Sequence, residues 1–201
     1  MADNFSQPTV QPPGAVFFIF GATGDLARRK LFPAIYSLYR EGKLAEDFAV
    51  IGVARRPRTD EEFKEDLYRS IEEFCRYKID DQEHWGRFAQ HFSYKSLDIN
   101  NVDGYHELRE LTESVEARFG IPGNRLFYLA LAPELFGSVS FNLQKGGMLD
   151  TSGWHRLVIE KPFGYDLQSA QKLNEELSQV FKEEEIYRIY HYLGKEMVQN
   201  I

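Results

Sequence analysis

Short unbroken apolar runs recur along the chain and alternate with segments whose apolar residues are spaced three or four positions apart. An apolar run without polar alternation is typical of a strand buried on both faces of a parallel sheet. The four clearest runs cover residues 16–20, 48–54, 126–131 and 157–159. Weaker strands are expected at about 91–97 and at 186–189.

Four amphipathic stripes predict helices between these strands. Thr59 to Glu62 has the capping-box pattern before the first stripe, Gly120 ends the second, and Asp166 is the expected N-cap of the last. The stripes are Phe63, Leu67, Ile71 and Phe74; Tyr105, Leu108, Leu111, Val115 and Phe119; Leu135, Val139 and Leu143; and Ala170, Leu173, Leu177 and Phe181.

This alternation of strand and helix indicates right-handed βαβ units, and therefore an α/β protein with a Rossmann-like, doubly wound parallel sheet. We expect residues 1–14 to form a flexible tail and residues 15–201 to form one domain. In such a sheet nearly every apolar stripe belongs to the core. Candidate functional residues are therefore sought at the carboxyl ends of the strands.

Composition limits the function classes. The 201 residues are 43% hydrophobic and 27% charged, as in an ordinary soluble globular protein. The net charge of −7 argues against nucleic-acid binding by bulk electrostatics, so an anionic ligand needs a local basic cluster. A single cysteine, Cys75, excludes an internal disulfide and argues against a zinc framework, so no metal site is expected.

No apolar run reaches the roughly 18 residues that a membrane span requires. The first 14 residues are polar, contain three prolines and lack the apolar core of a signal peptide. These features predict a cytoplasmic protein without a membrane partner.

A glycine-containing turn follows the first strand and precedes a helical stripe. Its pattern, G-x-x-G-x-x-A, is weak evidence by itself but stronger between a strand and a helix, where glycine lets a pyrophosphate approach the backbone amides. A structural turn without a ligand is the alternative. Because Pro33 does not suit a continuous helix, the regular helix is expected to start near it after a short turn. The turn residues are Gly21, Ala22, Thr23, Gly24, Asp25 and Leu26.

Two arginines, Arg55 and Arg56, follow the second strand. Folds that bind NAD usually carry an acidic residue at this place, which accepts hydrogen bonds from the ribose 2′-hydroxyl. A guanidinium group can instead bind a 2′-phosphate in a bidentate manner. The pair therefore favours NADP over NAD, with a solvated basic turn as the alternative.

Two further segments carry candidate chemistry. Lys161 follows the strand that ends at Glu160 and precedes Pro162, which could adopt a cis bond; its three donors suit sugar hydroxyls and phosphate oxygens. Downstream, an imidazole, a phenol and an ammonium group lie within five residues and would suit a phosphomonoester, although ordinary packing is an equal alternative. These residues are His191, Tyr192 and Lys195.

Four segments in register resemble glucose-6-phosphate 1-dehydrogenases. Residues 21–31 resemble the cofactor loop of that family, 160–164 its second motif and 188–196 its substrate signature, and 124–130 are also similar. The resemblance implies oxidation of glucose 6-phosphate to 6-phosphogluconolactone with NADP as hydride acceptor, a reaction of the pentose phosphate pathway. It also implies that whole family members form homo-oligomers through a second α+β domain that this chain lacks.

The same resemblance implies catalytic, substrate-binding and cofactor-binding roles for individual residues. Lys161 and Lys30 are the implied catalytic residues at the nicotinamide end. The implied substrate residues, which would hold the phosphate and the sugar, are Lys161, His191, Tyr192 and Lys195. The implied cofactor-binding residues are Gly21, Ala22, Thr23, Gly24, Asp25, Leu26, Arg55, Tyr128 and Lys161.

Two departures bear on activity. Tyr190 stands where the family has an aspartate that orients the general-base histidine, and a neutral phenol supplies no such charge. The histidine itself corresponds to a position after Ile201. We therefore expect the chain to be a coenzyme-binding part with little activity alone. Two alternatives stay open, a non-catalytic NADP-binding module and a sugar dehydrogenase like glucose–fructose oxidoreductase.

Overall fold

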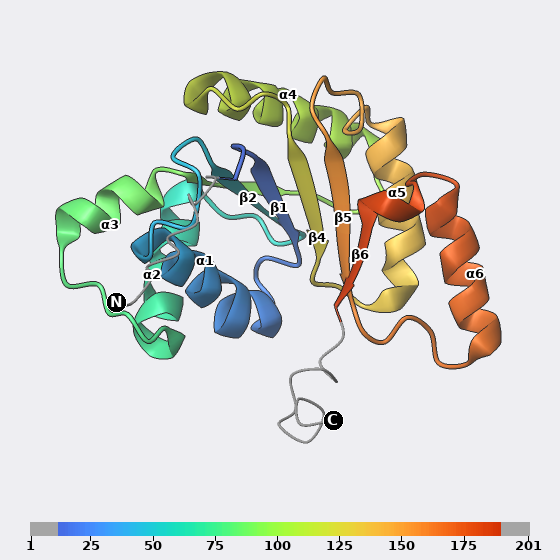
Figure 1. Ribbon diagram of the computed structural model, residues 1–201, viewed down its shortest axis with the longest axis horizontal. Coiled ribbons are helices and arrows are strands. Elements are labelled where there is room, and N and C mark those ends of the chain that lie inside the picture. Colours follow the sequence, from blue (N-terminus) through green and yellow to red (C-terminus); the bar gives the residue numbers. More distant parts are fainter. Residues whose placement is uncertain (1–11, 190–201) are drawn as a thin grey trace, which may run out of the picture.

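The computed structural model describes residues 12–189, which build one six-stranded sheet with helices on both sides (Figure 1). All neighbouring strands are parallel, in the order β3-β2-β1-β4-β5-β6. The order reverses between β1 and β4, where doubly wound sheets bind ligands. The strands are β1 (Val16–Phe20), β2 (Ala49–Ala54), β3 (Phe92–Ser96), β4 (Arg125–Leu129), β5 (His155–Glu160) and β6 (Ile186–Ile189). The predicted α/β fold class is confirmed.

The helices divide between the two faces of the sheet. α1, α2 and α3 cover one face and α4, α5 and α6 the other (Figure 1). Within residues 12–189, no helix is both long and apolar enough to cross a membrane. The helices are α1 (Phe32–Arg40), α2 (Asp60–Phe74), α3 (Gln82–Ala89), α4 (Val102–Phe119), α5 (Phe136–Lys145) and α6 (Leu167–Ser178), with short turns η1 (Ala27–Leu31), η2 (Pro133–Leu135) and η3 (Glu183–Glu185).

The central strand β1 supplies both cores because its side chains alternate between the faces. Phe18 and Phe20 belong to the core under α4, α5 and α6, whereas Ile19 belongs to the core under α1, α2 and α3. Phe18 also stacks on Phe127 of β4, with ring centroids 4.8 Å apart. Burying one such ring contributes about 1.5–3 kcal/mol, which explains the unbroken apolar run.

The predicted helix ends are confirmed by their hydrogen bonds. The Thr59 hydroxyl accepts from the Glu62 amide at 3.2 Å, and the Glu62 carboxylate accepts from the Thr59 amide at 2.9 Å, which completes the capping box of α2. Gly120 ends α4 with φ of 69°, a left-handed conformation. The Asp166 carboxylate caps α6 by accepting from the Ser169 amide at 2.8 Å.

Two local features add to the predicted pattern. As expected, the regular helix α1 begins beside Pro33 after a short turn, and this turn, η1, is π-helical. Proline donates no hydrogen bond and its ring crowds the carbonyl four residues earlier, so a wider turn accommodates it. Helix α3 was not predicted, because its eight residues include Gly86 and carry no full apolar stripe.

Candidate functional site

A cleft of about 530 Å³ lies at the carboxyl ends of β1, β2 and β4, where the strand order reverses. Four connections line it: the turn after β1, the end of β2, the loop after β3 and the segment after β4. Six of the lining residues are Gly21, Thr23, Gly24, Arg55, Asn100 and Leu131. Residues from four distant parts of the chain therefore share one concave surface of the size of a cofactor site.

The turn after β1 is fixed by backbone hydrogen bonds to its neighbours. The Gly21 amide donates to the Val53 carbonyl of β2 at 2.8 Å, and the Gly24 amide donates to the Gly21 carbonyl at 2.8 Å. Gly21 has φ of 87°, and a Cβ there would lie 2.3 Å from the Ala130 carbonyl oxygen. Only glycine therefore fits between β2 and β4 at this position.

The helix that follows begins directly after Gly24, which lines the cleft. The Gly24 carbonyl accepts from the Arg28 amide at 3.1 Å, and Asp25 and Leu26 already have helical conformation. The amides at the start of a helix lack intrahelical partners, and together with the helix dipole they favour an anion. The predicted phosphate loop, from Gly21 to Leu26, thus connects a buried strand to the start of a helix.

Arg55 lines the same cleft from the end of β2. Its backbone carbonyl accepts from the Ser96 hydroxyl of β3 at 3.2 Å, and the carbonyl of Arg56 accepts from the Tyr94 hydroxyl at 2.6 Å. Burial raises the pKa of Tyr94, which therefore stays a neutral donor. The main chain of the arginine pair is held by β3, while both side chains are exposed.

Tyr128 and Glu160 form a polar pair at the carboxyl ends of β4 and β5. The Tyr128 hydroxyl donates a hydrogen bond to the Glu160 carboxylate. Burial raises the pKa of Tyr128, and the bond to Glu160 raises it further. The phenol is therefore a neutral donor at physiological pH.

Lys161 follows Glu160 at the end of β5, is exposed, and precedes a cis peptide bond to Pro162, as the sequence suggested. Lys30 is exposed on η1. Neither lysine lines the 530 Å³ cleft, nor does Tyr128. The structure thus brings together Gly21, Thr23 and Gly24 of the loop with Arg55. The loop residues Ala22, Asp25 and Leu26 do not line the cleft, and neither do the other three candidates. The remaining candidates Tyr190, His191, Tyr192 and Lys195 lie outside the described residues.

Sequence reasoning missed part of the cleft wall, namely Leu97 to Asn100 after β3 and Ala130 to Ala132 after β4. Apart from Ala130, which ends the segment 124–130, these residues belong to no motif. Their position was nevertheless implied, since the carboxyl ends of parallel strands meet at one edge of the sheet.

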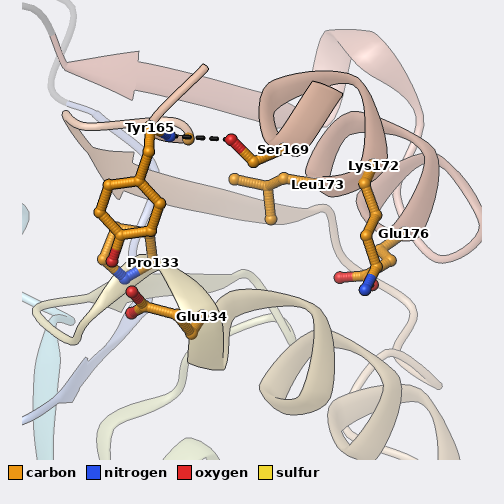
Figure 2. Close-up of a pocket in the computed structure, with 8 residues that line it drawn as sticks. Pro133, Glu134, Tyr165, Ser169, Lys172, Leu173 and Glu176 are labelled. Atoms are coloured by element: carbon orange, nitrogen blue, oxygen red, sulfur yellow. Dashed lines mark hydrogen bonds and ion pairs between the residues drawn. The ribbon is translucent and has the colours of Figure 1, made fainter. Parts of the chain in front are cut away.

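A second, smaller cavity lies between η2 and the start of α6 (Figure 2). Its volume is about 220 Å³, and Tyr165 extends over it toward Pro133 and Glu134. The Tyr165 amide donates to the Ser169 hydroxyl at 2.8 Å. Its charged lining residues are two carboxylates and one ammonium group, Glu134, Glu176 and Lys172. This charge does not suit a phosphate, so the 530 Å³ cleft is the better candidate for a dinucleotide.

Comparisons with known proteins show the family of this chain. A family model described as "Glucose-6-phosphate dehydrogenase, NAD binding domain" matches residues 18–200. A glucose-6-phosphate 1-dehydrogenase of Bacillus subtilis (strain 168) is 51% identical over 193 residues, which are 96% of this chain and 38% of the relative. One of Leuconostoc mesenteroides is 44% identical over 182 residues, 90% of this chain and 37% of the relative.

Solved structures give the same picture. A glucose-6-phosphate dehydrogenase in complex with its substrate glucose-6-phosphate is similar with a TM-score of 0.82 and 40% identity, over 94% of this chain and 38% of that one. The enzyme from Mycobacterium avium has a TM-score of 0.75 and 34% identity, over 91% and 37%. The chain spans about 38% of the length of such relatives.

Proposed function

Because this chain belongs to the glucose-6-phosphate dehydrogenase family, within its NAD-binding domain, we propose that residues 15–201 form the NADP-binding domain of an enzyme that oxidises glucose 6-phosphate. The product is 6-phosphogluconolactone, formed in the pentose phosphate pathway. The proposal includes a cytoplasmic location, assembly of the whole protein into homo-oligomers, and no nucleic-acid or membrane partner.

One observation carries the cofactor assignment. Arg55 and the phosphate loop line the same cleft, so a dinucleotide diphosphate on the loop amides has a guanidinium group beside its adenosine half. Leu97 and Ile99 supply apolar surface to that half of the cleft. An arginine in place of an acidic residue at the end of β2 favours a ribose 2′-phosphate, and hence NADP over NAD.

The nicotinamide half is assigned to the side of the sheet beyond β1. The Tyr128 hydroxyl donates to the Glu160 carboxylate, so the phenol keeps its proton and its orientation is fixed. Lys161 at the end of β5 donates to substrate hydroxyls, and Lys30 on η1 adds a second ammonium group at the same end of the molecule. The cofactor supplies the hydride-accepting carbon.

The substrate phosphate is assigned to His191, Tyr192 and Lys195. An imidazole, a phenol and an ammonium group within five residues offer several donors to one phosphomonoester. With Lys161 on the sugar, this set distinguishes glucose 6-phosphate from glucose. A sugar dehydrogenase of the glucose–fructose oxidoreductase type would bind both sugars in a similar way.

Calorimetric titration of the 201-residue chain with NADP and with NAD tests the proposal. We expect NADP to bind at least about tenfold more tightly, since one charge-assisted hydrogen bond contributes about 1.5–3 kcal/mol. With NADP present, glucose 6-phosphate should raise the unfolding temperature more than glucose does. Failure to bind either dinucleotide would refute the proposed function, and equal affinity for both would refute the role of Arg55.

A further inference from the structure

A third cavity, lined by three arginines, lies next to the phosphate loop and against α2. Its volume is about 280 Å³, and Thr23 lines both this cavity and the 530 Å³ cleft. The polar groups that line it are one hydroxyl, three guanidinium groups and one carboxylate. They belong to Thr23, Arg28, Arg58, Arg69 and Asp66, and we call this cavity the arginine pocket.

The lining of the arginine pocket contains three guanidinium groups and one carboxylate. The Asp66 carboxylate contacts both Arg58, through one oxygen, and Arg69, whose Nη1 lies 3.7 Å from the other oxygen. Arg58 and Arg69 thus share this carboxylate inside the pocket. Glu65 and Glu73, which do not line it, also pair with Arg69 and Arg28. In a chain of net charge −7, this concentration of arginine is the local basic cluster that an anion needs.

The arginines also keep donors for a ligand. Each guanidinium group has five N–H donors. Asp66 accepts only some of those of Arg58, and Asp66 and Glu65 together accept only some of those of Arg69. The Arg69 side chain is 68% exposed and that of Arg58 is 27% exposed. Arg28 is held by an ion pair with Glu73, which does not line the pocket. Arg58 is therefore the pre-positioned donor and Arg69 the adaptable one.

We propose that the arginine pocket binds a phosphate monoester dianion, with Arg58 and Arg69 as its principal donors and Thr23 as the link to the cleft. This inference rests on the proposed function for one of two sources of the phosphate. The group is either the 2′-phosphate of a dinucleotide in the cleft, contacted by Arg55 from one side and by the pocket from the other, or a free phosphate.

The test compares three probes on the 201-residue chain: 2′,5′-ADP, 5′-AMP and inorganic phosphate. Arg58→Gln and Arg69→Gln should weaken binding of the phosphate about five- to tenfold, because each removes a charged donor. Asp66→Asn should strengthen it by a similar factor, because it removes the competing negative charge. Opposite signs at neighbouring positions separate a ligand contact from a general loss of structure.

Arg87→Gln is the matched control. Arg87 is an exposed arginine that pairs with Glu83 one helical turn away, as Arg69 pairs with Glu65. It lies on α3 and lines none of the described cavities. This control should leave all three affinities unchanged, and urea unfolding of each variant checks that the fold is retained.

The probes distinguish the two sources. Changes confined to 2′,5′-ADP, with 5′-AMP unaffected, identify the 2′-phosphate. Changes in the affinity of inorganic phosphate, with 2′,5′-ADP unaffected, identify a free phosphate. The proposal is overturned if neither probe responds with opposite signs to the arginine and aspartate variants. If the wild-type chain binds no dinucleotide, the proposed function fails, while inorganic phosphate still decides the pocket.

Discussion

The hydroxyl of Tyr128 donates to the carboxylate of Glu160 across the boundary between β4 and β5. Tyr128 pairs in register with Val158, so Glu160 is its diagonal neighbour on the same face of the sheet. The pair therefore joins the strand beside the phosphate loop to the strand that carries Lys161.

The variant Tyr128→Phe tests this hydrogen bond between the strands. Removal of the hydroxyl should lower the free energy of unfolding by about 1 kcal/mol, measured in urea, because Glu160 loses a partner. NADP affinity should fall while 2′,5′-ADP affinity is retained, since the phenol is assigned to the nicotinamide half. An equal loss for both ligands would show that the effect is structural.

Arg55→Ala tests cofactor selection. We expect the affinity for NADP to fall at least about tenfold and that for NAD to remain nearly unchanged, because only NADP presents a 2′-phosphate. Calorimetric titration measures both, and Arg87→Ala serves as the exposed control. Equal losses for the two dinucleotides would contradict the assignment.

Gly21→Ala tests the turn. The left-handed backbone and the carbonyl of Ala130 leave no room for a Cβ, so the variant should lose at least about 2 kcal/mol of stability and its dinucleotide binding. Gly86→Ala is the matched control, because Gly86 is helical and a Cβ there meets nothing within 4 Å. It should stabilise the chain by up to about 1 kcal/mol. A tolerated Gly21→Ala would show that the turn adapts.

His91 predicts a pH dependence of stability. Its ring stacks between Phe48 and Phe119, at centroid distances of 4.2 and 4.6 Å, and its Nδ1 lies 2.6 Å from the Phe48 carbonyl oxygen. Burial lowers the pKa of His91; the hydrogen bond to the Phe48 carbonyl opposes this in part, and Arg118 lowers the pKa further. The unfolded chain thus binds more protons near pH 6, and stability should decrease as the pH falls below about 6.5.

Urea unfolding at pH 7.5 and 5.5 measures this effect. The difference between the two free energies should be smaller in His91→Gln than in the wild type, since the variant has no imidazole to protonate at this position. An unchanged difference would assign the pH dependence to other groups.

The sequence predicted features that depend on neighbouring residues. The apolar run of β1 and the capping box at Thr59 depend on local spacing, and both were found as expected. The loop at Gly21 and the basic end of β2 at Arg55 were found in one cleft because the parallel fold implies it. Short helix α3 was missed because packing by Phe88, and not a periodic stripe, specifies it.

The arginine pocket shows what local patterns cannot predict. Thr23, Arg58 and Arg69 come from three separate segments and meet only because α2 packs beside the loop. Each arginine alone reads as a solvated surface residue. The contact of Asp66 with Arg69 follows from helical spacing, whereas its contact with Arg58, which precedes α2, depends on the fold.

The anchoring of the turn after β2 has a consequence for engineering. Two side chains of β3, Tyr94 and Ser96, fix the main-chain carbonyls of Arg56 and Arg55. The backbone conformation of the turn after β2 therefore does not depend on the charges of the Arg55 and Arg56 side chains. Acidic or neutral replacements at these two positions should alter which dinucleotide is preferred without unravelling the scaffold, so redesign of coenzyme preference can begin there.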